Sequence, residues 1–282
     1  MAFAKGARVL IDAAAVFAWG LPRLRDLPWR ATRDPWVILV AEVMLQQTQA
    51  QRVIPSWQSF VAEFPDPAAC AAASLGDVLR RWQGLGYPRR ARNLHDAAVA
   101  IVERNDGHVP DNYDALLALP GVGPYTARAV LTFAFERDVG VVETNIARLL
   151  ARTSGRRLTG QEAQTLADDL VPAGAGWAWN QALIDLGAAI CRPAPRCAEC
   201  PVAARCAWHV AGHPPPDPAL GSFGVSTRQA PYEGSDRQRR GAVLTSLTMG
   251  PSPVTDFPAL IVDSLLADRL VVRDGDVLRL PE

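Results

Sequence analysis

Residues 116–145 read LLALPGVGPYTARAVLTFAFERDVGVVETN. An apolar segment ends at Leu119, the turn Pro120–Gly123 follows, and a second helix is predicted to start at Pro124, since proline suits a first helical turn. The two glycines of the turn permit positive φ and a close approach of another backbone. The N–H groups that open a helix have no partner within it, so they can bind a phosphate without a basic side chain. The pattern predicts a helix-hairpin-helix, and a plain turn between two packed helices is the alternative.

The composition sets broad limits on this chain of 282 residues. Hydrophobic residues make up 49% and charged residues 21%, which suits one large domain or two to three small ones. The formal net charge is zero, which argues neither for nor against nucleic acid, because the face that binds is local. Asp12 breaks the apolar N-terminal run and disfavours a signal peptide. Apolar runs such as Trp36–Ala41 are too short to span a membrane. We therefore expect a soluble, cytoplasmic protein.

Helical periodicity dominates the chain up to residue 210, so we expect an all-α body. The expected helices cover residues 7–19, 37–51, 55–64 and 76–83, one that runs from the turn at 84–93 to about 103, and 144–152, 161–170 and 177–189. Residues 211–236 are rich in Pro, Gly and Ser and are predicted to form a linker. Beyond them, residues 237–282 predict two helices and a hairpin with Asp-Gly at its turn, an arrangement that resembles a small winged helix.

Four of the five cysteines lie close together and are spaced C-x5-C-x2-C-x5-C, at Cys191, Cys197, Cys200 and Cys206. This density suits a metal site better than a disulfide scaffold. Four thiolates could hold a [4Fe–4S] cluster or a zinc ion, and the spacing alone leaves both open. Cys70 stands apart and is expected to be a buried apolar residue. The four histidines show no ligand spacing, and we assign them no chemistry.

A glutamate interrupts the most apolar of the predicted helices. Glu42 lies in the middle of PWVILVAEVMLQQTQ, residues 35–49. A carboxylate there is costly unless it is paired or protonated. Burial raises the pKa of such a group, which would suit a general acid near neutral pH. The alternative is a narrow polar stripe, since Gln46 and Gln49 would share the same helical face.

Several motifs together resemble one group of DNA repair enzymes. LPGVGxxTA, at residues 119–127, is similar to the hairpin of DNA glycosylases of the endonuclease III superfamily. AEVMLQQTQ, at residues 41–49, resembles the adenine DNA glycosylases of the MutY type, which remove adenine mispaired with 8-oxoguanine. GLGYPRRARNL, at residues 84–94, is similar to another motif of that family. The resemblance covers about residues 7–210.

The resemblance implies the two-domain, all-α fold of a helix-hairpin-helix DNA glycosylase. A six-helix barrel domain would occupy residues 29–136, and an iron-sulfur cluster domain would combine residues 1–28 with 137–210. The linker, 211–236, and the small winged-helix-like region, 237–282, would follow. Relatives carry a [4Fe–4S] cluster on C-x6-C-x2-C-x5-C. The resemblance therefore favours this cluster as the cofactor here, although the first interval is one residue shorter.

The resemblance also implies catalytic roles. Glu42 would protonate N7 of adenine and make the base a better leaving group. Glu143 stands where the superfamily has Asp, and its charge would stabilise the oxocarbenium-like sugar, although the side chain is one methylene longer. Asn145 would hold a carboxylate or the attacking water. Tyr125 stands where bifunctional members have the Lys that forms a Schiff base, so a monofunctional enzyme is expected.

The same resemblance implies a set of DNA contacts. Gln47 and Tyr87 would insert beside the damaged base pair, and arginines of the 84–94 motif would contact phosphates. The segment LPWR would line the adenine pocket, and the hairpin turn would bind the backbone. The full set of expected DNA-binding residues is Gln47, Thr48, Tyr87, Arg89, Arg92, Gly121, Val122, Gly123, Trp29 and Arg30.

The expected activity is therefore removal of adenine opposite 8-oxoguanine or guanine in base excision repair, leaving an abasic site. The partner would be double-stranded DNA with such mispairs, bound by a monomer at the nucleoid and by no membrane. Residues 237–282 are too short for the Nudix-like domain that many relatives use to recognise 8-oxoguanine, so recognition would rest on residues 46–49 and 84–94. Two alternatives stay open: a thymine or uracil mismatch glycosylase on the same fold, and a catalytically weak DNA-binding cluster protein.

Overall fold

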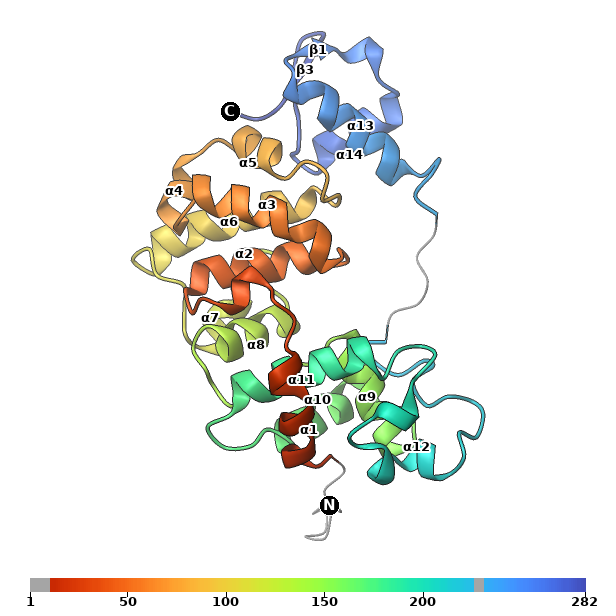
Figure 1. Cartoon of the computed structure of the whole chain (residues 1–282). Coiled ribbons are helices and arrows are strands. Elements are labelled where there is room, and N and C mark those ends of the chain that lie inside the picture. The colour runs from red at the N-terminus through yellow and green to blue at the C-terminus, as the bar shows by residue number, and fades with distance from the viewer. Residues whose placement is uncertain (1–10, 226–230) are drawn as a thin grey trace. The chain divides into compact units, whose positions relative to one another are not determined.

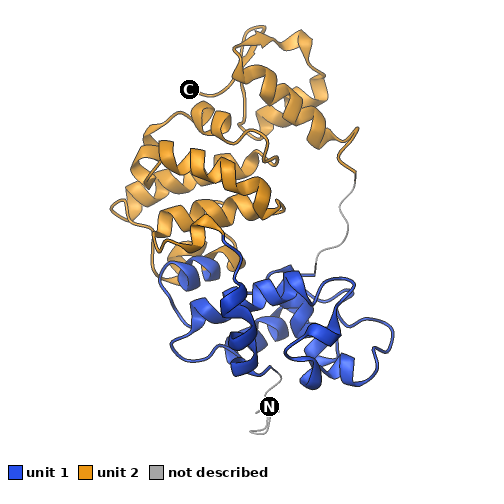
Figure 2. Cartoon of the chain, viewed as in Figure 1, with its two compact units in different colours: residues 1–26, 128–228 blue, residues 27–127, 229–282 orange. Residues whose placement is uncertain are grey.

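The computed structural model describes residues 11–225 and 231–282. Contacts within the chain separate two compact units (Figure 2). Unit 1 combines residues 1–26 with 128–228, and unit 2 combines residues 27–127 with 229–282. The division falls inside a helix, α8 (Pro124–Phe133), whereas the sequence placed a domain boundary at 136. In the described residues no helix is long and apolar enough to cross a membrane.

The helices of unit 2 begin where short polar side chains cap them. The side chains of Asp34, Asp66, Ser74 and Asn112 each accept a backbone N–H of the first helical turn, which satisfies donors that a helix leaves unpaired. The resulting elements are η2 (Pro28–Arg30), α2 (Pro35–Leu45), α3 (Ala50–Glu63), α4 (Pro67–Ala72), α5 (Leu75–Arg81), α6 (Arg89–Arg104), α7 (Tyr113–Leu117) and the start of α8 (Figure 1).

The core of unit 2 is built around α2. Eight of the eleven residues of this helix are buried. Its Leu39 is fully buried, as are Phe60 of α3 and Leu94 and Ile101 of α6. Helix α2 is thus the central helix of this unit, and the buried Glu42 belongs to it.

The predicted helix over 37–51 is wrong at its C-terminal end. Helix α2 ends at Leu45, Gln47 takes a positive φ of 57°, and α3 begins at Ala50 and continues through Pro55. The guanidinium of Arg90 donates to carbonyl groups at the end of α2, which takes the place of further helical bonds. The proposed polar stripe that joined Glu42 to Gln46 and Gln49 on one helical face therefore does not exist.

The hairpin between α7 and α8 is present, and its two glycines differ. Gly121 has a φ of 75°, and a β-carbon there would lie 2.6 Å from the β-carbon of Asn93, so the turn packs closely on α6. Gly123 has no positive φ, and a β-carbon there would meet nothing within 4 Å. The N–H of Val122 donates to the carbonyl of Leu119 at 3.1 Å, so this donor is used within the turn.

Unit 1 is helical as well. Its helices are α1 (Ala13–Gly20), α9 (Thr144–Ser154), α10 (Gly160–Asp169), α11 (Gly176–Ala189) and the short α12 (Ala207–Val210), together with the 3-10 turns η1 (Leu21–Arg23), η3 (Cys197–Glu199) and η4 (Ala203–Arg205). Helix α1 packs tightly on α11, because a β-carbon at Gly20 would lie 2.7 Å from that of Ala182. The first residues of the predicted helix 7–19 lie outside the described residues.

The predicted linker is attached to unit 1 at a few points. Asp217 forms an ion pair of 2.6 Å with the buried Arg152 of α9. The backbone N–H of Phe223 donates to the carbonyl of Leu158 at 3.0 Å, and Ser222 is buried. Residues 226–230 lie outside the described residues. The composition of this segment predicted a linker. The ion pair of Asp217 and the hydrogen bond of Phe223 nevertheless hold its first part against unit 1.

The C-terminal region of unit 2 has the expected helices and hairpin. It contains α13 (Asp236–Thr248), β1 (Ser252–Pro253), η5 (Val254–Asp256), α14 (Ala259–Ala267), β2 (Val272–Asp274) and β3 (Val277–Arg279). The strands form an antiparallel sheet in the order β1-β3-β2, with the turn at Gly275. The region packs on α5, where the N–H of Gly76 donates to the carbonyl of Pro281 at 2.8 Å. It is winged-helix-like and belongs to the same unit as the body of residues 27–127.

Candidate functional site

Glu42 is held inside the core of unit 2. Glu42 is 5% exposed. Trp29 of η2, in the same unit, is 7% exposed, and its ring meets that of Trp57 edge to face at 5.8 Å. Both predicted site residues are therefore withdrawn from solvent in this structure.

Glu143 caps the start of α9 in unit 1. Its Oε1 accepts the backbone N–H of Ile146 at 2.8 Å, and its Oε2 accepts the side-chain amide of Asn145 at 3.0 Å. The Oδ1 of Asn145 accepts from Arg148 at 2.8 Å. The Nε of Arg148 in turn donates to the carbonyl of Cys191. A continuous chain of hydrogen bonds therefore joins the Glu143 carboxylate to the first cysteine of the run.

The surroundings of Glu143 act on its charge in opposite directions. Burial raises the pKa of the carboxyl group. Hydrogen bonds from the backbone of Asn145 and Ile146, and the positive charges of Arg148 and Arg25, oppose that rise without cancelling it. An anionic role for Glu143 thus depends on these donors.

Arg90 connects two loops of unit 2. One of its nitrogens donates to the carbonyls of Val43, Met44 and Gln46 at 3.0, 2.8 and 2.6 Å. The other donates to the Thr48 hydroxyl and to the carbonyls of Leu85 and Gly86, all between 3.0 and 3.1 Å. Burial lowers its pKa to about 10, so it remains charged at neutral pH. This arginine fixes the loop after α2 against the loop before α6.

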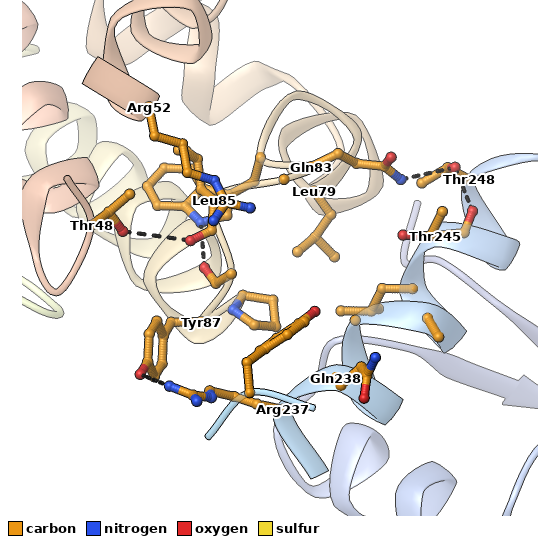
Figure 3. A pocket seen from close by; sticks show the side chains of 18 of the residues that line it. Thr48, Arg52, Leu79, Gln83, Leu85, Tyr87, Arg237, Gln238, Thr245 and Thr248 are labelled. Carbon is orange, nitrogen blue, oxygen red and sulfur yellow. Dashed lines mark hydrogen bonds between the residues drawn. The ribbon is translucent and has the colours of Figure 1, made fainter. Parts of the chain in front are cut away.

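The two loops line a cavity of about 1000 Å³ in unit 2 (Figure 3). Gln47, Thr48 and Tyr87 all contribute to it, as the resemblance implied for residues beside a damaged base pair. Gln47 and Tyr87 have backbone φ values of 57° and 49°, which residues with a β-carbon rarely adopt. Such strain is often found where a protein binds a ligand. The opposite wall comes from α13, including Arg237 and Gln238.

Two of the predicted phosphate contacts lie against the C-terminal region. Arg89 pairs with the carboxylate of Asp268 at 2.6 Å, and Arg92 donates to the backbone carbonyl of Asp268 at 2.5 Å. Arg240 of α13 also pairs with this carboxylate. Burial would raise the pKa of Asp268, but the hydrogen bonds from Arg89 and Arg240 outweigh it and hold the pKa below its ordinary value. The C-terminal region is thereby anchored to α6.

The four cysteines of the run line one small cavity in unit 1. They share it with apolar residues, and the full lining comprises Leu149, Arg152, Thr153, Ile190, Cys191, Pro195, Cys197, Cys200, Val202, Ala203, Cys206, Trp208 and His209. All four thiols are free of disulfides. Burial raises the pKa of Cys200 to about 11 and shifts the pKa values of Cys197 and Cys206 in the same direction. A positively charged group is therefore needed to make these thiols thiolates, and the donor set suits a metal or a cluster.

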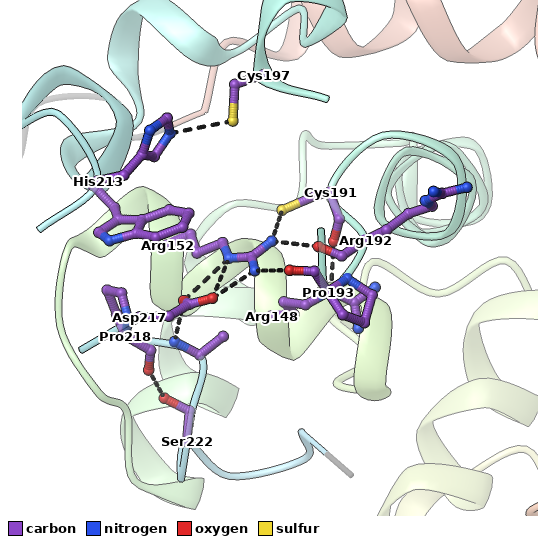
Figure 4. Close-up of polar contacts among 12 residues, drawn as sticks. Arg148, Arg152, Cys191, Arg192, Pro193, Cys197, His213, Asp217, Pro218 and Ser222 are labelled. Carbon is purple, nitrogen blue, oxygen red and sulfur yellow. Dashed lines mark hydrogen bonds and ion pairs between the residues drawn. The ribbon is translucent and has the colours of Figure 1, made fainter. Parts of the chain in front are cut away.

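Arg152 and His213 contact two of the four cysteines, Cys191 and Cys197 (Figure 4). Arg152 is 2% exposed and donates to the Sγ of Cys191 at 3.5 Å and to the carbonyl of Arg192 at 2.6 Å. The Nε2 of His213 lies 3.4 Å from the Sγ of Cys197 and 3.1 Å from the Nδ1 of His209. These three side chains could themselves hold a metal ion. The prediction that no histidine has ligand geometry is therefore wrong.

Comparisons with known proteins identify the family. Residues 40–172 match the HhH-GPD superfamily of base excision DNA repair proteins. The adenine DNA glycosylase of Mycobacterium tuberculosis is 44% identical over 283 residues, which cover 93% of this chain and 90% of the relative. The chain belongs to the adenine DNA glycosylase family. The human adenine DNA glycosylase is 38% identical over 216 residues, which cover 71% of this chain and 40% of the human protein.

Solved structures show the fold of this family member. A thermostable thymine-DNA glycosylase aligns with a TM-score of 0.66 and 30% identity, covering 70% of this chain and 94% of that protein. A trapped endonuclease III–DNA complex aligns with a TM-score of 0.61, and its 23% identity supports the fold alone. The predicted helix-hairpin-helix DNA glycosylase fold is confirmed. The chain is a DNA glycosylase of base excision repair, and its fold supports DNA binding.

Three contacts of this glycosylase were not predicted from the sequence. Arg90 was expected on a phosphate, but its side chain is buried inside the protein. His209 and His213 come together, and their separation by four residues could have indicated a shared helical or turn face. Asp268 meets α6 from a distant segment, for which no local sequence signal exists.

Proposed function

We propose that this chain is a monofunctional DNA glycosylase that removes adenine mispaired with 8-oxoguanine or guanine and leaves an abasic site. The observation that carries this proposal is the burial of Glu42 in the core helix α2, within a motif shared with adenine DNA glycosylases. The relative from Mycobacterium tuberculosis, which matches over 93% of the chain, is named an adenine DNA glycosylase. Double-stranded DNA is the partner, the active species is a monomer, and the place of action is the nucleoid.

The chemistry follows from the two carboxyl groups. Adenine is first turned out of the duplex, because its glycosidic bond is inaccessible within the stack. Glu42, in its protonated form, then donates its proton to N7 of adenine and makes the base a better leaving group. Glu143 in its ionised form stabilises the positive charge that develops on the sugar, and Asn145 holds that carboxylate in place.

No Schiff base forms in the proposed reaction. The second residue of α8 is Tyr125, and a phenol cannot form an imine with the sugar. Water therefore completes the reaction, and the strand stays intact until the abasic site is treated with alkali.

The base opposite adenine would lie beside the loops that Arg90 joins. Gln47, Thr48 and Tyr87 line the large cavity of unit 2, which has room for a nucleobase. The ring of Tyr87 can stack on any base, since every base has a π face. The hairpin turn at Gly121–Gly123, with open space at Gly123, would accept the DNA backbone.

We also propose a [4Fe–4S] cluster as the cofactor, held by Cys191, Cys197, Cys200 and Cys206. The four thiols line one cavity with apolar walls, which suits four iron-thiolate bonds. The cluster would order the loop between Cys191 and Cys206 and carry no step of base removal. Arg152 would support it by its contact with the Sγ of Cys191.

A mismatch glycosylase acting on thymine is the second candidate, because a thymine-DNA glycosylase shares the fold at 30% identity. The test is single-turnover base release from duplexes with A opposite 8-oxoguanine, A opposite G, and T opposite G, with and without alkali. The proposal predicts loss of adenine, with strand cleavage only after alkali. Release of thymine alone would support the second candidate. Binding without release of any base would show that Glu143 cannot replace Asp.

A further inference from the structure

Tyr87 is held by a residue of the C-terminal region. Helix α13 begins at Asp236, and Arg237 in its first turn donates to the phenol oxygen of Tyr87 at 2.6 Å (Figure 3). The guanidinium carbon of Arg237 lies 5.5 Å from the centroid of the Tyr87 ring and 5.6 Å from that of Tyr232. A cation at that distance is attracted by both ring faces.

A second arginine acts on Tyr87 from within the body. Arg90 lies 5.5 Å from the centroid of the Tyr87 ring and donates to the carbonyl of Gly86 at 3.0 Å. The backbone of Tyr87 has the unfavourable φ of 49°. Arg90 therefore supports the loop and one side of the ring, whereas Arg237 holds the hydroxyl end of the side chain.

Helix α13 is itself fixed to the body at both of its ends. Near its start, Arg240 pairs with Asp268, which also pairs with Arg89 of α6. Near its end, Thr248 accepts a hydrogen bond of 2.9 Å from the side chain of Gln83. The position of Arg237 is thus determined by contacts that do not include Tyr87.

We propose that Arg237 is a positioning residue that determines preference for the base opposite adenine. It keeps the Tyr87 ring directed at that base, so the C-terminal region contributes to recognition although it is far shorter than a Nudix-like domain. This inference rests on the proposed function. Arg237 touches no reacting atom, so its loss should change the discrimination between opposite bases more than the release of adenine itself.

The test compares Arg237→Met, Arg237→Lys, Tyr87→Phe and the double variant Arg237→Met/Tyr87→Phe in the full chain. The matched control is Arg239→Met on the same helix, because the side chain of Arg239 is 58% exposed and pairs with Asp236 of its own helix. Two quantities are measured for each: the single-turnover rate with A opposite 8-oxoguanine or G, and the affinity for the same duplexes with an uncleavable 2′-fluoro-adenosine.

We expect Arg237→Met to reduce the preference for 8-oxoguanine over G by about tenfold, which corresponds to about 1.4 kcal/mol. Tyr87→Phe should have a similar effect, and the double variant should be no worse than either, since both remove one contact. Arg237→Lys should retain part of the preference, and Arg239→Met all of it.

Three results would overturn the inference. These are an unchanged preference in Arg237→Met, an equal loss of rate and affinity on both duplexes, and effects of Arg237→Met and Tyr87→Phe that add in the double variant. The affinity measurement separates this inference from the proposed function. If the wild type releases no adenine but prefers 8-oxoguanine through Arg237, the proposed function fails and the role of Arg237 stands.

Discussion

The side-chain amide of Asn145 donates a hydrogen bond of 3.0 Å to the carboxylate of Glu143. We expect Asn145→Ala to lower the single-turnover rate of adenine release by about 10- to 100-fold, because a hydrogen bond to a charged group contributes about 1.5–3 kcal/mol. The measurement is base release under single-turnover conditions. Arg156→Ala, an exposed variant in the same unit, is the control. A wild-type rate in Asn145→Ala would show that this amide does not support the reaction.

Glu143→Gln should abolish adenine release and yet stabilise the protein at neutral pH. Burial raises the pKa of Glu143, so the folded protein binds this proton more tightly than the unfolded chain does. The resulting stability is complete below the ordinary pKa of glutamate and is lost as pH rises through the raised value. Glutamine carries no charge and avoids that loss. The Tm of the variant should therefore exceed that of the wild type by a margin that grows as pH rises from the ordinary pKa of glutamate through the raised pKa of Glu143.

Glu162 provides a control for this prediction, because its pKa is shifted in the opposite direction from that of Glu143. Hydrogen bonds from Thr159 and Arg156 lower its pKa to about 2. Its stabilising effect is present above the ordinary pKa and is lost only in strong acid, so Glu162→Gln should lower the Tm at neutral pH. A pH-independent difference for Glu143→Gln would contradict the raised pKa.

Arg90→Lys should destabilise unit 2 and disturb recognition together. Lysine cannot donate to six acceptors on two loops, and we expect the free energy of unfolding to fall by about 2–4 kcal/mol. Urea denaturation measures this change. Arg104→Lys, exposed in the last turn of the same helix, should leave stability unaltered. Equal stability of Arg90→Lys and the wild type would disprove that Arg90 stabilises unit 2 by joining the two loops.

Asp268→Asn should loosen the C-terminal region. The pKa of Asp268 is held below its ordinary value, so its contribution to stability is present above that value and is lost as pH falls through the lowered one. The variant should be about 1–2 kcal/mol less stable than the wild type at neutral pH, and the difference should disappear as pH falls through the lowered pKa of Asp268. Asp256→Asn, an exposed change in the same region, is the control. A difference that persists in acid would exclude the ion pairs as its cause.

Cys200→Ser should prevent assembly of the proposed cluster. Protein purified without oxygen is expected to contain about four iron atoms per chain and no zinc. The variant should lose iron and the visible absorbance, and unit 1 should become more sensitive to protease. Cys70→Ala, which changes a buried cysteine outside the cavity, should retain the iron. Zinc at one atom per chain would instead favour a site such as Cys197, His209 and His213.

The local parts of the fold could be predicted from the sequence. The hairpin, the cysteine run and the C-terminal helices each depend on residues that are neighbours in the chain, and all are present in the structure. The predicted C-terminal end of α2 was wrong because the carbonyl groups there accept hydrogen bonds from Arg90, which is more than forty residues away in the sequence. Helical propensity at Gln46–Thr48 contains no information about such a partner.

Only one wall of the cavity beside Tyr87 could be predicted, because the other wall depends on residues that are distant in the sequence. Its loops follow from family motifs, whereas its second wall depends on pairs such as Arg237 and Tyr87, which are 150 residues apart. Ion pairs between distant surface segments leave no periodic pattern in a single sequence. The roles of Glu42, Glu143 and the DNA-binding residues remain predictions that the measurements above can decide.

The contact between Gly121 and Asn93 has a consequence for variation within the family. Two features require glycine at position 121. One is its φ of 75°, and the other is that a β-carbon there would lie only 2.6 Å from that of Asn93. The Oδ1 of Asn93 accepts a hydrogen bond of 3.0 Å from Arg92 of the same helix, so its side chain lies between α6 and the turn. A change of volume at 93, on a helix that is not part of the hairpin, would therefore displace the turn without altering any residue in it. Under the proposed role of the turn in DNA binding, mutational drift at this one position would change that binding while every motif of the hairpin stays intact.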